Sequence, residues 1–333
     1  MKVAVLGSGS WGSALAKVLS DNGHPVSLWG RRPELAAAIE ATRENATFLP
    51  GVRFAPALTA TSSLEEALDG ADLLVVAVPT HGLREVLRAA AGYIPPGIPV
   101  VSATKGIEEG TLEFVHEMIA GEVPWTRETF VALSGPSFAR EVAAGLPTVV
   151  VAAARDLALA RVVQEAFWTD DRFRVYLSDD VVGVEVGGAL KNVVAIAAGA
   201  SDGLGFGHNT RAALITRGLA EIARLTMKMG GHALTLAGLA GMGDLVLTCT
   251  GELSRNRHVG LLLGQGQTLP EILGGMRQVA EGVRTAHSAW DLAQREGVSM
   301  PITEQVYLAL YHGKPLRDAV HDLMTRTAGH ERD

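Results

Sequence analysis

The feature that most constrains the fold is a short apolar run followed at once by a glycine-rich loop. Val3–Leu6 reads VAVL, and residues 7–12 read GSGSWG. Four consecutive apolar residues are typical of a strand buried on both faces, as in a parallel sheet. Residues 11–20 then have helical spacing. A buried strand, a glycine loop and a helix in this order form the context in which such a loop predicts dinucleotide binding.

The three glycines of the loop have separate physical roles. Gly7 permits a tight turn, Gly9 lets the main chain approach a pyrophosphate, and Gly12 lets the helix pack closely on the strand. The helix N-terminus adds partial positive charge and N–H groups that favour phosphates. The alternative is an ordinary glycine-rich turn without a ligand; we expect the dinucleotide.

Short apolar runs recur along the first half of the chain and alternate with helical stretches. One of these helices has Pro33 in its first turn, where proline is well tolerated. This alternation predicts an open, doubly wound α/β sheet, a Rossmann domain over residues 1–178. The expected strands after the first are residues 26–29, 71–79, 98–106, 130–136, 147–154 and 173–178.

From about residue 180 the pattern changes to long Ala-, Gly- and Leu-rich stretches with helical spacing and no strand alternation. We expect an all-α second domain over residues 179–333. Its most apolar segment, residues 181–200, contains Glu185 and Lys191. These charges, and the shortness of the N-terminal apolar run, lead us to expect neither a membrane span nor a signal peptide.

Composition limits the partners and the cellular compartment. Hydrophobic residues make up 47% of the 333 residues, which is ample for packed cores. The formal net charge of -7 argues against a general binder of nucleic acid or of anionic membranes. The single cysteine, Cys249, excludes an intramolecular disulfide. We therefore expect a cytoplasmic protein, with Cys249 as a small buried residue.

The end of the second expected strand selects the nucleotide. NAD-specific folds place an Asp or Glu there, where it binds the ribose 2′-hydroxyl. Here Gly30 stands at about that place, and Arg31 and Arg32 follow. Arginine suits a 2′-phosphate because its N–H groups form charge-assisted hydrogen bonds. We expect NADPH to be preferred, with NADH usable; a solvated basic helix start is the alternative.

Two polar motifs follow expected strands. Lys105 comes after VVSAT, and Ser137 lies in SGPSFA, directly after FVAL. In open α/β sheets, ligands bind beyond the carboxyl ends of the strands. We therefore expect both motifs at a ligand site, although a lysine in this position is often a surface residue.

The helical half contains two further candidates. Lys191 lies among small and apolar residues, so it is either a snorkelling surface lysine or a desolvated amine suited to proton transfer. Asp244 lies between a glycine pair and an apolar run. Residues 254–256 read SRN, a hydroxyl, a guanidinium and an amide in succession, which suits a phosphate or polyol; the alternative is a polar loop. The ten histidines show no metal-ligand spacing, and we expect no metal.

Seven motifs along the whole chain together resemble one family, the bacterial NAD(P)-dependent glycerol-3-phosphate dehydrogenases. The match extends in order across both halves, and seven motifs in sequence are far more specific than one. The motifs are GSGSWG, ADLLVVAVPT, VVSATKGIE, LSGPSFAREV, GGALKNVVAIAAG, GLAGMGDLVLTCTGELSRNR and VAEGVRTA.

The resemblance implies a Rossmann domain, a helical domain and an active site between them. It implies reversible hydride transfer between NAD(P)H and dihydroxyacetone phosphate, giving sn-glycerol 3-phosphate for glycerophospholipid synthesis, and it suggests a homodimer. Lys191 matches the proton-transferring lysine. Besides the three glycines, cofactor contacts match Ser10, Trp11, Arg31, Arg32, Lys105, Ala139, Arg255, Val279 and Glu281. Substrate contacts match Lys105, Gly135, Ser137, Lys191, Asp244, Ser254, Arg255 and Asn256, with Asn192 and Thr248 near the substrate in the wider family.

One position departs from the family pattern, and two other functions compete. Phe48 stands where the family often has tyrosine, so any contact made by that hydroxyl is absent. A β-hydroxyacid dehydrogenase of the same architecture is the nearest alternative; the SRN triplet and SGPSF favour the phosphorylated substrate instead. A non-catalytic NADPH-binding sensor is a third possibility, disfavoured by the complete set of Lys105, Lys191, Asp244 and Arg255.

Overall fold

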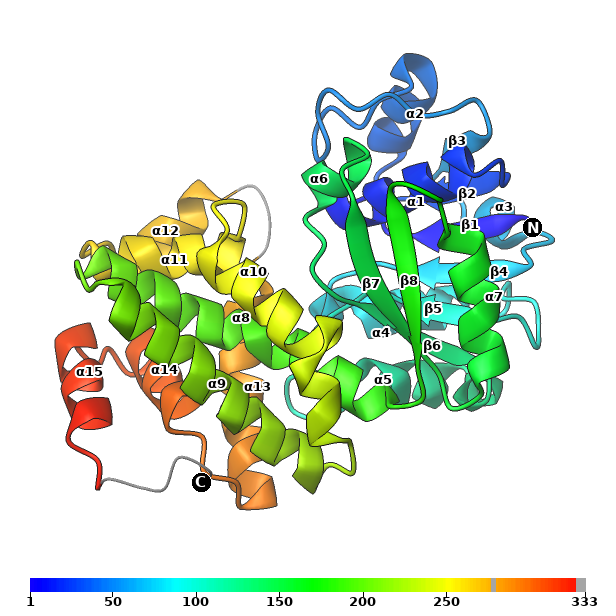
Figure 1. Ribbon diagram of the computed structural model, residues 1–333. Coiled ribbons are helices and arrows are strands. Elements are labelled where there is room, and N and C mark those ends of the chain that lie inside the picture. Colours follow the sequence, from blue (N-terminus) through cyan, green and yellow to red (C-terminus); the bar gives the residue numbers. More distant parts are fainter. Residues whose placement is uncertain (277–279, 328–333) are drawn as a thin grey trace. The chain divides into compact units, whose positions relative to one another are not determined.

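The computed structural model describes residues 1–276 and 280–327, and these form two compact units (Figure 1). The first unit comprises Met1–Lys105 and Val115–Val181. The second comprises Gly106–Phe114 and the described residues from Val182 onward. The expected Rossmann domain followed by a helical domain is confirmed.

The first unit is built on one eight-stranded sheet with the order β3-β2-β1-β4-β5-β6-β7-β8. The strands from β3 to β6 pair in parallel, which is the arrangement of a dinucleotide-binding fold. The strands are β1 (Val3–Leu6), β2 (Val26–Trp29), β3 (Leu58–Thr61), β4 (Leu73–Val76), β5 (Val100–Ser102), β6 (Phe130–Ser134), β7 (Thr148–Ala153) and β8 (Phe173–Ser178).

Two features of this sheet differ from the simple sequence pattern. β3 had no counterpart among the expected strands, because three of its four residues are exposed or half-buried and only Leu58 is fully buried. β7 runs antiparallel to β6. The short helix between these strands packs against α1, and the chain returns alongside β6 instead of crossing the sheet.

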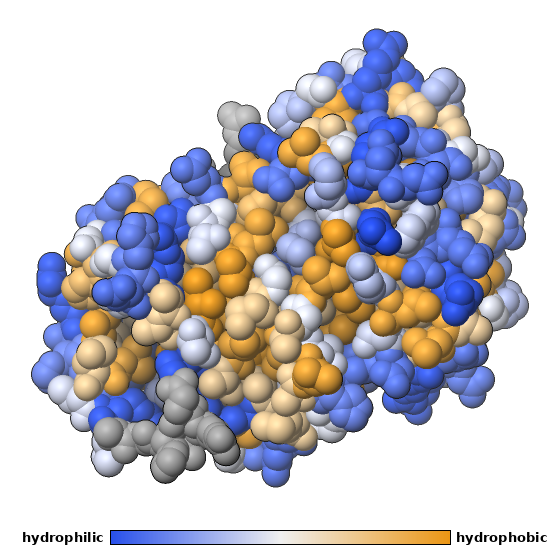
Figure 2. Space-filling view, viewed as in Figure 1, coloured by the Kyte–Doolittle hydropathy of each residue, from blue (hydrophilic) through white to orange (hydrophobic). Residues whose placement is uncertain are grey.

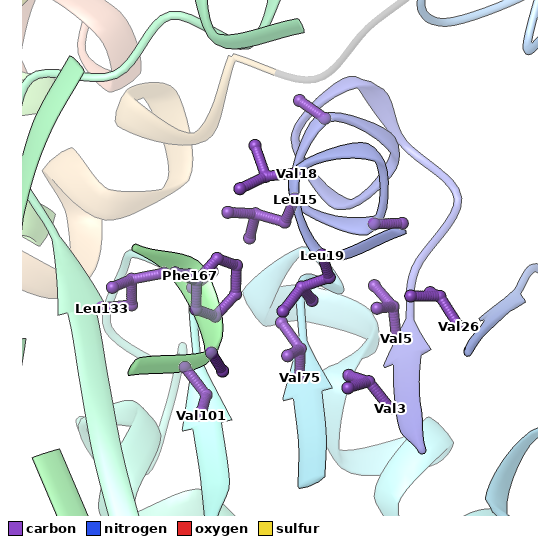
Figure 3. Close-up of a cluster of buried hydrophobic side chains, with 14 of the residues drawn as sticks. Val3, Val5, Leu15, Val18, Leu19, Val26, Val75, Val101, Leu133 and Phe167 are labelled. Atoms are coloured by element: carbon purple, nitrogen blue, oxygen red, sulfur yellow. The ribbon is translucent and has the colours of Figure 1, made fainter. Parts of the chain in front are cut away.

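Helices cover both faces of the sheet. α1, α6 and α7 pack together on one face, and α3, α4 and α5 form a second group (Figure 1). In Figure 3, Leu15 and Leu19 project from α1 toward β4 and toward Phe167 of α7, in a fully buried core. These helices are α1 (Ser10–Asp21), α2 (Pro33–Thr42), α3 (Leu64–Leu68), α4 (Thr80–Ala90), α5 (Val115–Glu122), α6 (Ala139–Ala143) and α7 (Leu157–Phe167).

The second unit is helical and is organised around α8. Eighteen residues of this helix are long and apolar enough to cross a membrane, but 89% of that window is buried inside the protein. We interpret α8 as the core helix of the unit. The helices are α8 (Val181–Gly203), α9 (His208–Lys228), α10 (Asp244–Thr250), α11 (Arg255–Gly264), α12 (Leu269–Gly275), α13 (Glu281–Glu296), α14 (Pro301–Tyr311) and α15 (Leu316–Met324).

Part of the helical unit's surface is apolar. Figure 2 shows hydrophobic residues gathered over α9 and α10. Large hydrophobic side chains exposed on or beside these helices are Met227, Leu234, Met242 and Val246. Ile107 and Phe114, from the segment that interrupts the first unit, are by contrast buried in the core of the helical unit.

Candidate functional site

The glycine-rich loop leaves open space at one of its three glycines only. Gly7 has φ +117°, and a Cβ there would lie 2.5 Å from the Ala77 carbonyl oxygen. A Cβ on Gly12 would lie 1.9 Å from the Gly7 carbonyl oxygen. A Cβ on Gly9 would have nothing within 4 Å. Gly7 and Gly12 are therefore required by the protein's own packing, whereas Gly9 borders space that a ligand can fill.

The loop ends at the N-terminus of α1, where main-chain N–H groups point outward. Gly9 is the N-cap and has no side chain to accept a hydrogen bond, and the first turn contains no acidic residue. The helix dipole and these N–H groups together favour an anion. The residues present therefore fit the pyrophosphate of a dinucleotide.

Asn45 and Phe48 form hydrogen bonds with this loop and with the start of α1. The Asn45 side chain is fully buried and donates to the Ser8 carbonyl and the Ser13 hydroxyl, both at 2.8 Å. The Ser10 hydroxyl donates to the Phe48 carbonyl at 2.7 Å. Sequence reasoning missed Asn45, because a single Asn in a polar stretch carries no pattern of its own.

Phe48 also contacts one of the two arginines expected at the nucleotide. The Arg32 guanidinium carbon lies 5.2 Å from the centre of the Phe48 ring, within cation–π range. Arg31 and Arg32 are both exposed at the start of α2. The aromatic ring at position 48 thus has a role that requires no hydroxyl.

Three expected substrate residues meet at neighbouring strand ends. β5 and β6 are adjacent and parallel, so Lys105 and the segment after Ser134 lie at the same edge of the sheet. The Lys105 amine lies 3.5 Å from the Gly135 carbonyl oxygen, to which the Ser137 hydroxyl donates at 2.9 Å. Ala139 begins α6 directly afterwards.

In the helical unit, Lys191 is buried and paired. Its ammonium forms an ion pair with the Asp244 carboxylate and donates to the Thr248 hydroxyl at 3.1 Å. Lys191 is 7% exposed and Asp244 1% exposed, so the snorkelling interpretation of this lysine is wrong. The Thr248 hydroxyl in turn donates to the Asp244 main-chain carbonyl at 2.6 Å.

Two opposing effects act on the charge of this lysine. A carboxylate in contact with a buried amine stabilises the ammonium form and opposes the effect of desolvation. A short π-helical turn, Leu239–Gly243, leads into α10 directly before Asp244, and such turns are frequent at functional sites. One turn further along, burial raises the pKa of the Cys249 thiol to about 12, so this neighbour stays neutral.

The SRN triplet forms the start of α11. Ser254 is the N-cap, and its hydroxyl accepts from the Arg257 main-chain N–H at 3.2 Å. Asn256 is buried; it donates to the Asn192 side chain at 2.8 Å and accepts from the Gly282 N–H at 2.9 Å. Arg255 is exposed and interacts electrostatically with Glu281, the first residue of α13. We call Ser254, Arg255 and Asn256, which are expected at the substrate, the substrate clamp.

Trp11 and Val279 are the remaining residues expected at the cofactor. Trp11 is half-buried against the core of the Rossmann unit. Val279, an expected cofactor contact, lies outside the described residues. Within residues 1–276 and 280–327, no group of three His, Cys, Asp or Glu side chains is placed to hold a metal ion.

Sequence comparisons point to a single family. The family model described as NAD-dependent glycerol-3-phosphate dehydrogenase N-terminus matches residues 2–160, and the corresponding C-terminus model matches residues 180–321. A protein of Geobacter metallireducens named glycerol-3-phosphate dehydrogenase (NAD(P)+) is 58% identical over 333 residues, 99% of each chain. A protein of the same name from Geobacter sulfurreducens is 57% identical over 332 residues, again 99% of each chain.

Solved structures agree with the sequence comparisons. The crystal structure of glycerol-3-phosphate dehydrogenase from Coxiella burnetii superposes with a TM-score of 0.93 at 40% identity. It covers 98% of this chain and 99% of its own. A yeast glycerol-3-phosphate dehydrogenase has a TM-score of 0.83 at 29% identity, covering 98% of this chain and 99% of its own.

Proposed function

The chain belongs to the NAD-dependent glycerol-3-phosphate dehydrogenase family, and from this premise we propose how its own residues carry out the reaction. Membership makes it an oxidoreductase that depends on a nicotinamide cofactor and interconverts sn-glycerol 3-phosphate and dihydroxyacetone phosphate. In our proposal Lys191 exchanges the proton and NADPH is preferred over NADH. The observation that carries the proposal is the buried Lys191, paired with the Asp244 carboxylate and hydrogen-bonded to the Thr248 hydroxyl.

The helical unit supplies the residues for proton transfer, Lys191 and Asp244. A nicotinamide cofactor held by the Rossmann unit would supply a hydride to C2 of dihydroxyacetone phosphate, which would place negative charge on the carbonyl oxygen. The Lys191 ammonium stabilises this charge and donates the proton that completes the alcohol. Asp244 keeps Lys191 protonated and oriented before the transfer. In the reverse direction the neutral Lys191 amine takes the proton from the alcohol.

The substrate phosphate is assigned to the substrate clamp. The exposed Arg255 supplies a fixed positive charge and a bidentate donor set, which suits a phosphate dianion. Ser254 and Asn256 add a hydroxyl and an amide on the same helical turn. From the Rossmann unit, Lys105, Gly135 and Ser137 complete the proposed set of substrate contacts.

The cofactor site is assigned to the Rossmann unit, with two late contacts from the helical unit. The open space at Gly9 and the uncapped N-terminus of α1 receive the pyrophosphate. Arg31 and Arg32 receive the adenosine 2′-phosphate, and Ser10, Trp11 and Ala139 line the same site. From the helical unit, Val279 and Glu281 add the late contacts, and Arg255 lies near both cofactor and substrate. The preference for NADPH follows from the two exposed arginines at a position where NAD-specific folds carry an acid.

The first experiment follows absorbance of the nicotinamide with purified protein and dihydroxyacetone phosphate, using NADPH and NADH in parallel. We expect faster oxidation of NADPH, and we expect the double variant Arg31→Ala, Arg32→Ala to lose that preference. Equal or better use of NADH by the unaltered enzyme would contradict our assignment of the arginines. Turnover of a β-hydroxyacid in place of dihydroxyacetone phosphate, or binding without any turnover, would contradict the reaction itself.

Three broader assignments belong to the same proposal. We propose that the protein is cytoplasmic, that its product serves glycerophospholipid synthesis, and that it forms a homodimer. The first rests on the single cysteine, and the other two on the family resemblance. Light scattering of the purified protein checks the homodimer directly.

A further inference from the structure

The helix that carries the proposed proton donor also contacts the helix that carries the substrate clamp, at three places along its length. α8 contains Lys191 and Asn192 near its middle and Asp202 near its C-terminal end. Asp202 lies eleven residues after Lys191, which is about 16 Å along a helix. α11 begins at the clamp and runs alongside α8. The geometry of this pair of helices therefore determines where the clamp lies relative to Lys191.

The first contact is in the clamp itself, and the second is between the two main chains. Asn256 donates to Asn192, as described above. Further along, a Cβ on Gly199 would lie 1.9 Å from the Arg257 carbonyl oxygen, and a Cβ on Gly260 would lie 2.0 Å from the Ile196 carbonyl oxygen. Glycine is required at both positions because the two helices are in direct main-chain contact there.

The third contact is an ion pair at the end of α8. The Arg257 guanidinium donates to one Asp202 oxygen from Nε at 3.0 Å and from Nη2 at 2.6 Å. Arg211, in the first turn of α9, donates from Nη1 to both oxygens of the same carboxylate at 3.1 Å. The side chains of Asp202, Arg211 and Arg257 are 13%, 20% and 17% exposed, so solvent screens these pairs only in part.

The first turn of α11 needs such a pairing for an electrostatic reason. It contains Arg255 and Arg257 and no acidic residue. A positive side chain is unfavourable at a helix N-terminus, where the helix dipole is itself positive. The carboxylate of Asp202 neutralises Arg257 and holds its side chain against α8, whereas Arg255 stays exposed.

We propose that Asp202 is a positioning residue for this dehydrogenase: through Arg257 it holds the first turn of α11, and with it the substrate clamp, at a fixed place relative to Lys191. Asp202 acts through another residue and touches neither substrate nor cofactor. This inference rests on the proposal that Ser254, Arg255 and Asn256 bind the substrate phosphate.

The test compares Asp202→Asn and Arg257→Met with a matched control, Arg211→Met. The control removes the other arginine on the same carboxylate, but Arg211 belongs to α9 and not to the clamp helix. We expect Asp202→Asn and Arg257→Met each to lower kcat/KM for dihydroxyacetone phosphate about tenfold or more, mainly through KM, because small displacements of positioning groups have effects of this size. KM for NADPH should rise much less, because most of the proposed cofactor contacts lie in the Rossmann unit and Arg255 is the one clamp residue that the two ligands share.

The control variant and a double variant test whether Asp202 acts through Arg257. Arg211→Met should lower the melting temperature but leave KM for dihydroxyacetone phosphate within about twofold, below the 1.4 kcal/mol that a tenfold change represents. The double variant Asp202→Asn, Arg257→Met should have the same KM as Asp202→Asn alone, because the single substitution already removes the Asp202–Arg257 pair. An equal rise of KM in all three single variants, or none in any, would overturn the proposal and leave Asp202 with a purely structural role.

One further variant separates this inference from the function on which it rests. Arg255→Gln removes the clamp's fixed charge directly. If Arg255→Gln leaves KM for dihydroxyacetone phosphate unchanged, the proposed clamp is wrong and the inference fails with it. If Arg255→Gln raises that KM while Asp202→Asn and Arg257→Met do not, the clamp stands and only the role of Asp202 is wrong. Circular dichroism and thermal unfolding show that each variant compared is folded.

Discussion

The glycine-rich loop of the Rossmann unit and the Lys191–Asp244 pair of the helical unit are built on opposite principles. The loop offers main-chain N–H groups and leaves space by having no side chain at Gly9. The pair offers a charged side chain, and that side chain is buried. The first region exposes main-chain groups because Gly9 has no side chain, and the second places a charged side chain away from water.

This difference determines what each region tolerates. A main-chain site depends on the few positions where a side chain would collide or would block the ligand, and other side chains can vary. A buried ion pair depends on both of its members, because removing one leaves the other charge uncompensated, which typically costs 3–5 kcal/mol. In the loop, a mutation should therefore be able to weaken ligand binding without lowering stability. At the Lys191–Asp244 pair, a mutation should lower both activity and stability.

The largest effect is expected at the pair. Lys191→Met should lose about 10²–10⁴-fold in turnover, because the proton donor is gone, and should also be destabilised by the unpaired Asp244. The double variant Lys191→Met, Asp244→Asn removes both charges and should recover much of the stability while remaining inactive. Steady-state kinetics and thermal unfolding measure the two effects separately. Turnover of either variant within about threefold of the unaltered enzyme would exclude Lys191 from proton transfer.

In the loop, stability and ligand binding should be affected by different glycines, Gly12 and Gly9. Gly12→Ala forces a Cβ against the Gly7 carbonyl oxygen and should cost about 1–3 kcal/mol of stability. Gly9→Ala has open space around it, so the protein should melt at an unchanged temperature. NADPH binding by Gly9→Ala should nevertheless weaken about 10- to 100-fold, since the same clash then falls on the ligand. Calorimetry and fluorescence titration of both variants check this, and unchanged binding by Gly9→Ala would remove the loop from the cofactor site.

A second buried ionisable side chain, Glu221, extends the comparison to the pH dependence of stability. Glu221 is 2% exposed and accepts hydrogen bonds from the Ile302 N–H at 2.6 Å and from the Thr303 N–H at 3.1 Å, at the start of α14. Burial raises the pKa of Glu221 to about 7, although these hydrogen bonds oppose the shift. Between the unfolded pKa near 4.5 and about 7, the folded protein therefore retains a proton that the unfolded chain has lost.

The sign of the effect on stability follows from linkage. The contribution of Glu221 is fully present below pH 4.5 and is lost as the pH rises to about 7, by an amount on the order of 3 kcal/mol. Glu221→Gln should flatten the fall in unfolding free energy between pH 5 and about 7. The control Glu271→Gln alters an exposed capping carboxylate of α12, whose pKa is lowered by its hydrogen bonds with Thr268, and should leave that fall intact. Equal slopes in the unaltered protein and Glu221→Gln would contradict the assignment.

The smallest effect is expected at Phe48, whose ring contacts the exposed Arg32. Phe48→Leu removes the ring under Arg32 but keeps an apolar side chain, so it should weaken NADPH binding about two- to fivefold. NADH binding should not change, because NADH has no 2′-phosphate. Phe48→Tyr keeps the ring and should behave like the unaltered protein. A parallel loss for both cofactors in Phe48→Leu would mean that the ring acts on the nucleotide directly.

The sequence by itself determined most of the Rossmann unit and the identity of the candidate residues. Buried parallel strands read as continuous apolar runs, so β1, β4 and β6 were evident from the sequence. The position of Gly9 between a strand and a helix predicts a dinucleotide there, and the structure shows open space at this glycine. β3 was missed because an edge strand is only partly buried and carries a weak pattern. These are local properties, since strand burial and turn geometry depend on a few neighbouring residues.

Only the tertiary structure decided how the helical unit uses its charges. The pattern around Lys191 left burial and exposure equally open, and nothing in it pointed to Asp244, 53 residues further along. The same holds for Asp202 with Arg257, and for Ile107 and Phe114, which are buried in the helical core although their segment interrupts the Rossmann unit. The physical reason is that the charge state of a buried group depends on which distant chain segment replaces its water, and helical periodicity does not record that segment.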